Sequence, residues 1–306
     1  MLFMTTVFTE IVGVWKGREE RMETHLWSPQ GKGVVIGDNL PAVIIGERIN
    51  PFGKGPLKEA MISGDLKPIR EEALKQVEAG ADILIISIAA FGIDEEVALP
   101  RITEEIIKTV DIPLCLESRN PVALEKTLKL GCGKPIISSV TGENAMLEQI
   151  LPLVKKYNTA VVALASDTSG VPKNSSSRLK IINYIVEKAQ EAGIGLEDII
   201  ADCVAESSAV DHMAAIITLE TMEMVKLKWG VNLILGASNV SFGLPNRSAI
   251  NAVFLSFAIQ RGLTCAIVNT AQMKTYVMAA DLLLGRDQGA RKFIAYYRKL
   301  KSVSPH

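Results

Sequence analysis

The feature that most limits the fold of this chain is a repeated pairing of a short apolar run with a longer helical pattern. The pairing starts at residue 43, recurs eight times and continues to about residue 300, in units of about 30 residues. None of the runs alternates apolar with polar residues, which is typical of parallel strands covered on both faces. The eight runs are AVIIG, DILIISIAA, PLCLES, KPIISS, AVVALAS, DIIADCV, NLILGAS and TCAIVN.

Glycines at the ends of the helical segments support this division. Glycine enters the left-handed conformation at the lowest cost and therefore favours helix C-termini. These glycines are Gly80, Gly131, Gly193, Gly230, Gly262 and Gly285. Eight strand–helix units predict an α/β fold, a (β/α)8 TIM barrel, over residues 43–306. A doubly wound sheet is the alternative, but it rarely has eight units of such even length.

A short N-terminal extension, residues 1–42, lies outside the repeat. We expect it to form a hairpin or an arm that closes the bottom of the barrel or mediates association. The segments 214–229 and 249–262 are apolar on more than one helical face. Covering a barrel needs only one apolar face, so this excess predicts a homodimer.

Composition excludes several classes of partner. The formal net charge of the 306 residues is −1, which favours neither nucleic acid nor an acidic membrane surface. No apolar run approaches the ~18 residues of a membrane span, and the N-terminus lacks the basic region of a signal peptide. The four cysteines form no CxxC motif and the three histidines no HExxH motif, so we expect no bound metal and a cytoplasmic location.

Polar residues collect where the apolar runs end. In a barrel of this kind all strands end on one rim, which carries the active site. The rim candidates are Glu47, Arg48, Asn50, Ser87, Glu117, Ser118, Asn120, Ser138, Ser139, Thr141, Ser166, Asp167, Thr168, Asp202, Ser238, Asn239, Ser241, Asn246, Arg247 and Asn269. Carboxylates, amides and hydroxyls in one ring suit a planar heterocycle rich in nitrogen.

The competing interpretation is that these residues are helix caps and turn residues, where Ser, Thr, Asp and Asn are common. We favour it for Ser118, Asn120, Ser139 and Asn174. It explains Asp202 less well, because an unpaired carboxylate inside the apolar run IIADCV would be costly to bury. Asn239 follows an apolar strand directly and is equally hard to dismiss.

Four segments carry a resemblance to a known family. They are IIGERIN at 44–50, TSGVPK at 168–173, DH at 211–212 and LGASNVSFGLPNR at 235–247. Over about residues 43–300 the chain resembles the pterin-binding methyltransferases that move a methyl group between methyltetrahydrofolate and a corrinoid protein. The pterin domain of cobalamin-dependent methionine synthase and dihydropteroate synthase are more distant relatives.

The resemblance implies roles for individual residues. Asn239 falls on the catalytic asparagine that reaches N5 of the folate, and Asp202 falls on the aspartate that binds the pyrimidine side of the pterin. Further substrate-binding positions are Glu117, Ser138, Ser87, Asn50, Ser241 and Arg247. The substrate would be methyltetrahydrofolate or a related pterin. The corrinoid (cobalamin) would be carried by a separate partner protein, because this chain has no DxHxxG segment.

Three positions depart from the family pattern. Ile85 stands where the family carries aspartate, Glu117 replaces aspartate, and Ser138 replaces asparagine. Each ligand group left unpaired by such a change would cost roughly 1–3 kcal/mol of binding free energy. The alternative is therefore a barrel of the family fold with altered or lost folate binding, which acts on another ligand or as a non-catalytic partner in a corrinoid methyltransferase system.

Overall fold

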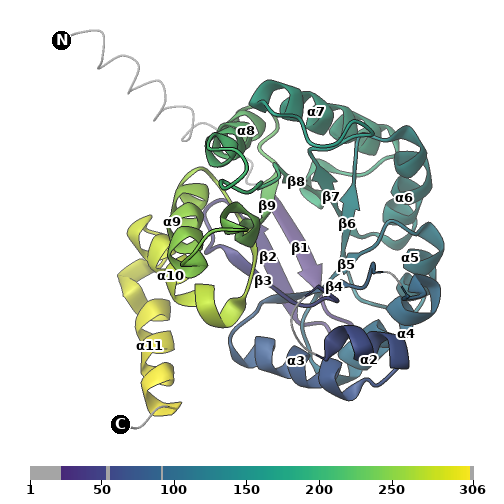
Figure 1. Ribbon diagram of the computed structural model, residues 1–306, viewed down its shortest axis with the longest axis horizontal. Coiled ribbons are helices and arrows are strands. Elements are labelled where there is room, and N and C mark those ends of the chain that lie inside the picture. Colours follow the sequence, from purple (N-terminus) through teal and green to yellow (C-terminus); the bar gives the residue numbers. More distant parts are fainter. Residues whose placement is uncertain (1–21, 53–55, 91, 304–306) are drawn as a thin grey trace.

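The eight apolar runs form the eight strands of a closed parallel barrel, as the sequence predicts (Figure 1). The computed structural model describes residues 22–52, 56–90 and 92–303, with side chains up to residue 298. The ring closes because the last strand pairs with the first. In ring order from the first, the strands are β3 (Val43–Ile49), β4 (Ile83–Ser87), β5 (Leu114–Glu117), β6 (Ile136–Val140), β7 (Ala160–Leu164), β8 (Ile199–Asp202), β9 (Asn232–Gly236) and β10 (Cys265–Val268).

Helices surround the barrel, and the six glycines predicted to follow them all adopt positive φ. The α-helices are α2 (Leu57–Ser63), α3 (Lys67–Glu78), α4 (Glu95–Thr109), α5 (Pro121–Leu128), α6 (Asn144–Tyr157), α7 (Ser175–Glu191), α8 (Ala214–Lys228), α9 (Arg247–Gln260), α10 (Thr270–Leu283) and α11 (Arg291–Val303). The described residues also form three short 3-10 helices, η1 (Leu196–Asp198), η2 (Ala237–Ser241) and η3 (Gln288–Ala290).

Each strand directs alternate side chains into the barrel and outward to the helices. On β4, Ile83 and Ile85 belong to a buried cluster to which every barrel strand contributes. The intervening Leu84 and Ile86 belong to the larger cluster between strands and helices. A strand residue two positions beyond Ile85 therefore faces the lumen again, one layer nearer the rim.

A β-hairpin packs against the beginning of the barrel strands. It consists of β1 (Glu23–Trp27) and β2 (Gly33–Gly37), which pair antiparallel and cross the centre of the helical ring in Figure 1. Leu26 and Ile36 are buried in the same cluster as the lumen residues. Asn232, the first residue of β9, donates to the Ile36 carbonyl oxygen over 3.1 Å. The hairpin thus covers the end of the lumen opposite the polar rim; residues 1–21 of the extension lie outside the described residues.

Large apolar side chains remain exposed on the outer helices. Phe257 on α9 is 57% exposed and Leu283 on α10 is 86% exposed, and the two helices pack side by side. No helix in the part of the chain that the structure describes combines the length and apolar character of a membrane span.

Candidate functional site

Ser87, Glu117 and Ser138 lie side by side on the rim. In the ladder of β4, β5 and β6, Ser87 pairs with Glu117, and Glu117 pairs with Ser138. The Ser87 hydroxyl also hydrogen-bonds to the Glu117 carboxylate. Three adjacent strands therefore present one polar row, one layer above Ile85 and its apolar neighbours.

The Glu117 side chain is exposed at the open mouth of the barrel, and the surrounding strand ends remove part of the hydration of its carboxylate. The loss of hydration raises its pKa, and the nearby Glu95 carboxylate raises it further, whereas the hydrogen bond from Ser87 opposes this. A carboxyl with a raised pKa is well suited to hold or accept a proton.

Asp202 ends β8 and is the most perturbed carboxyl of the rim. Burial raises its pKa from 3.8 to about 7, and the Glu117 carboxylate adds to this. The Val204 N–H, which donates to Oδ1 over 2.8 Å, and the Arg178 guanidinium act in the opposite direction. Among the described residues no hydrogen bond reaches Oδ2, so this oxygen is available to a ligand.

The turn of η2 is fixed by Arg247. Its Nη2 donates to the Ser238 carbonyl oxygen over 2.8 Å, and its Nε donates to the Ser241 hydroxyl over 3.0 Å. The guanidinium also lies 5.8 Å from the centre of the Phe242 ring. Ser241 is fully buried. Arg247 and Ser241 hold the loop that carries Asn239; that they also bind substrate stays a prediction.

Glu47, one of the rim candidates from the sequence, joins this group, although Asn50 is the residue of this segment that the resemblance predicts to bind substrate. The Ser238 hydroxyl lies 3.1 and 3.2 Å from the two Glu47 carboxylate oxygens. Burial raises the Glu47 pKa, while Ser238, Arg48 and Arg247 lower it. The alternation along β3 could have indicated it, because Glu47 is two residues beyond Ile45, which faces the lumen.

Asn50 and the expected structural residues make local contacts. The Asn50 side chain donates to the Glu47 carbonyl oxygen and accepts from the Phe52 N–H, which builds a turn after β3. Asn120 caps α5 and Asn174 caps α7 through their side-chain oxygens, as predicted. Ile85 is only 4% exposed and packs in the lumen cluster.

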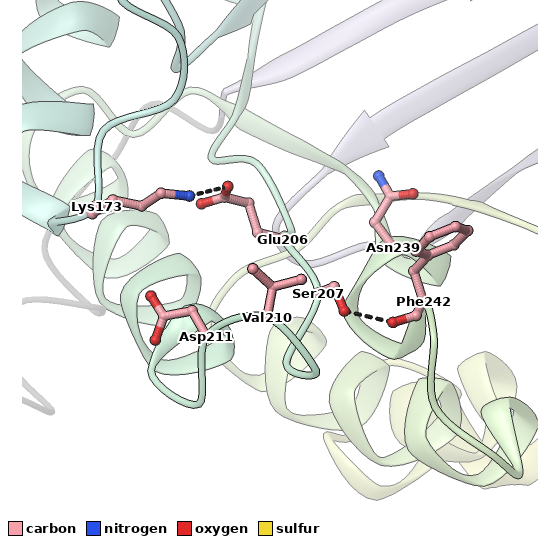
Figure 2. Close-up of a pocket in the computed structure, with 7 residues that line it drawn as sticks. All are labelled: Lys173, Glu206, Ser207, Val210, Asp211, Asn239 and Phe242. Carbon is pink, nitrogen blue, oxygen red and sulfur yellow. Dashed lines mark hydrogen bonds and ion pairs between the residues drawn. The ribbon is translucent and has the colours of Figure 1, made fainter.

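Asn239 stands apart because its side chain is exposed and, within the described part of the chain, receives no hydrogen bond. It borders a pocket of about 260 Å³. Figure 2 shows this pocket between η2 and the loop after β8, with Lys173 paired to Glu206 on one side. Lys173 and Asp211, from the segments TSGVPK and DH, both line it. Segments far apart in sequence thus meet beside Asn239.

The rim offers acceptors at the ends of β5 and β8 and an uncommitted amide in the loop after β9. Glu117 and Asp202 can accept hydrogen bonds from N–H groups, and the Asn239 amide can either donate or accept. No cluster of metal-ligating side chains occurs among the residues described. The rim therefore suits a nitrogen-rich ring held by its edge, with one ring atom presented to Asn239.

Comparison with known proteins extends this picture. The family model described as pterin binding enzyme matches residues 46–269. The chain is 29% identical over 266 residues to a methylcorrinoid:tetrahydrofolate methyltransferase of Eubacterium limosum, covering 85% of this chain and 97% of that protein. It is 27% identical over 254 residues to the methionine synthase of Mycobacterium tuberculosis, covering 78% of this chain and 21% of that longer protein.

Solved structures show the same fold. A dihydropteroate synthase of Coxiella burnetii in complex with pteroic acid aligns with a TM-score of 0.65 and 17% identity, covering 86% of this chain and all of that one. The dihydropteroate synthase of Yersinia pestis gives a TM-score of 0.64 and 13% identity, covering 86% of this chain and 99% of that chain. At these identities the likeness concerns the barrel and not the chemistry at its rim.

Proposed function

The chain belongs to the family of pterin-binding enzymes, and from this premise we propose that it is a methyltransferase. It moves a methyl group between N5 of methyltetrahydrofolate, or a related pterin, and the cobalt of a corrinoid carried by a separate protein. The similarity to the Eubacterium limosum enzyme over nearly its whole length supports this proposal. We further propose that the chain acts as a homodimer in the cytoplasm.

The observation that carries the proposal is the uncommitted amide of Asn239, in the loop after β9, together with the desolvated carboxyl of Asp202 at the end of the neighbouring strand β8. A ring bound at its pyrimidine edge by Asp202 and Glu117 would present another nitrogen to Asn239. Ser87 and Ser138, next to Glu117 in the ladder, would contact the same edge.

Transfer from N5 requires a change in the charge of that nitrogen. The N5–CH3 bond breaks as the cobalt–carbon bond forms, and the electron pair of the broken bond stays on N5. Without a proton the pterin would leave as a poor, anionic leaving group. The Asn239 oxygen can accept from a protonated N5, which stabilises the charged state through which the reaction passes. No side chain of this chain needs to act as a nucleophile.

A second candidate function is binding of another ligand by the same barrel. The apolar packing of Ile85 beneath the polar row favours it, because this side chain offers no hydrogen bond to a ring edge. A pterin that needs an acceptor at that point would then bind weakly. The alternative keeps the fold and the loop of Asn239 but changes the edge that the rim recognises.

Two measurements test the proposal. Calorimetric titration of the purified protein with methyltetrahydrofolate should give saturable binding, which Asp202→Ala abolishes. Incubation of the complex with free cob(I)alamin as acceptor should then yield methylcobalamin, observed by absorbance. Absence of binding at millimolar pterin, in protein that is folded by circular dichroism, would refute the folate reaction and leave the second candidate.

A further inference from the structure

Arg178 is fully buried although its guanidinium is charged. It lies in the first turn of α7 and reaches beneath the loops that follow β7 and β8. Nε donates to the Pro172 carbonyl oxygen over 2.8 Å, and Nη1 donates to the carbonyl oxygens of Cys203 and Val204 over 2.9 and 2.7 Å. Nη2 donates to the Glu206 carboxylate over 2.6 Å. One side chain thus ties together the two loops that flank Asp202.

Val204, one of the residues that Arg178 holds, has an unfavourable backbone conformation. Its φ is +60°, a strained conformation that is rare for a β-branched residue. Such a conformation persists only where its surroundings enforce it. The Thr218 hydroxyl lies 2.8 Å from the Val204 carbonyl oxygen that Arg178 also contacts. Arg178 therefore holds this carbonyl oxygen, and Thr218 is a second donor to it, although the Ala214 carbonyl oxygen lies 2.9 Å from the same hydroxyl.

The other side of Val204 faces the candidate site. Its N–H donates to Oδ1 of Asp202 over 2.8 Å. If Val204 relaxed to negative φ, this N–H would turn away, and the Asp202 carboxyl would lose the one hydrogen bond that orients it. The contacts form a chain from Arg178 through the backbone of Cys203 and Val204 to Asp202.

We propose that Arg178 is a positioning residue for ligand binding, which keeps Val204 in the left-handed conformation and thereby aims the Asp202 carboxyl into the barrel mouth. In naming a pterin as the ligand, the inference rests on the proposed function. Arg178 itself does not touch the ligand, because it is buried behind the loop.

The first test replaces Arg178 by lysine, which keeps the charge but cannot donate from a planar fork to several carbonyl oxygens. In Arg178→Lys the dissociation constant for methyltetrahydrofolate should rise roughly tenfold to hundredfold. The rate of methyl transfer at saturating pterin should stay within about threefold, because the change concerns ground-state binding. A role limited to packing would lower the amount of folded protein and leave the affinity of the folded fraction intact.

The decisive variant adds Val204→Gly to Arg178→Lys. Glycine adopts positive φ without strain, so the loop no longer needs Arg178 to hold it. The double variant should recover affinity to within about threefold of the wild type. Asn158→Gly is the matched control, because Asn158 also has positive φ, at +50°, but lies at the C-terminal end of α6. It should leave the affinity of Arg178→Lys unrestored.

Three outcomes would overturn the inference. They are wild-type affinity in Arg178→Lys, no recovery in the folded double variant, and equal recovery with Asn158→Gly. Should Arg178→Lys not fold, Thr218→Val removes the second donor to the Val204 carbonyl and should give a smaller loss that Val204→Gly again restores; a loss that Val204→Gly leaves in place contradicts the inference.

Failure of the proposed function would be separate. In that case wild-type protein binds no methyltetrahydrofolate. Hydrogen exchange of the ligand-free proteins then tests whether Arg178 holds the backbone of Val204. The Val204 amide should exchange faster in Arg178→Lys than in the wild type, or faster in Thr218→Val where the lysine variant does not fold. Equal exchange rates would overturn the positioning role.

Discussion

Replacing Asp202 by asparagine should stabilise the free protein in a manner that depends on pH. Burial raises the pKa of Asp202 from 3.8 to about 7. Well below pH 3.8 the carboxyl is protonated in both the folded and the unfolded chain, so it has little effect on stability, and near pH 4 its effect is still small. As pH rises from 4 to 7 the unfolded chain gains free energy by ionising, whereas the folded chain does not, and wild-type stability falls.

The size of this loss follows from the two pKa values. At about 1.4 kcal/mol per pKa unit, a rise from 3.8 to about 7 corresponds to on the order of 4 kcal/mol, reached near pH 7 and constant above it. Asparagine does not ionise and keeps an oxygen that accepts from the Val204 N–H. Asp202→Asn should therefore gain free energy of unfolding relative to wild type, by at least about 2 kcal/mol at pH 8 once solvent near the rim is allowed for.

Urea unfolding of both proteins at pH values from 4 to 8 provides the assay. The difference between the two should be small at pH 4, which is the internal control, and should grow to a plateau above pH 7. A difference that is the same at every pH would show that the Asp202 pKa is not raised by folding. The same substitution should weaken pterin binding, so this carboxyl exchanges stability for function.

Further predictions concern the rim and the outer helices. Asn239→Ala should lower the rate of methyl transfer roughly a hundredfold while changing pterin affinity by less than about threefold, as single-turnover assays and titration will show; equal losses in both would assign Asn239 to binding only. Ile85→Asp combined with Ser138→Asn should tighten pterin binding about tenfold or more and lower stability, because position 85 is buried among apolar side chains; unchanged affinity in the folded variant would contradict the orientation of the ring. Light scattering should give the mass of a dimer at micromolar concentration, and Phe257→Glu with Leu283→Glu, at exposed positions on α9 and α10, should give a monomer; a monomeric wild type would refute the dimer.

The barrel was predictable from sequence because its signals are local. Short apolar runs, helical periodicity and glycines with positive φ each appear within a few neighbouring residues. The parallel topology then assigns every strand end to one rim, so Glu117 and Ser138 could be expected side by side without knowledge of any contact.

The sequence did not reveal features that depend on the alternation of inward and outward side chains along a strand or on contacts between distant segments. The pairing register of β3 shifts between Gly46 and Ile49, so the alternation that indicates Glu47 from Ile45 fails one step later, at Ile49, which packs in the larger cluster between strands and helices. Arg178 reads as an ordinary helix arginine in SSSRLK. Its burial follows from the loops after β7 and β8, which lie over it only in the folded chain.

The hairpin of β1 and β2 has a kinetic consequence for the proposed reaction. Since Leu26 and Ile36 close one end of the lumen, pterin and corrinoid must both approach from the open end of the barrel, at the rim. A corrinoid protein bound over this open end prevents a bound pterin from leaving and a free pterin from entering. For the proposed reaction, binding is then ordered: the pterin binds first and leaves last. A large excess of the demethylated corrinoid protein would bind the enzyme that holds no pterin and lower the steady-state rate of methyl transfer.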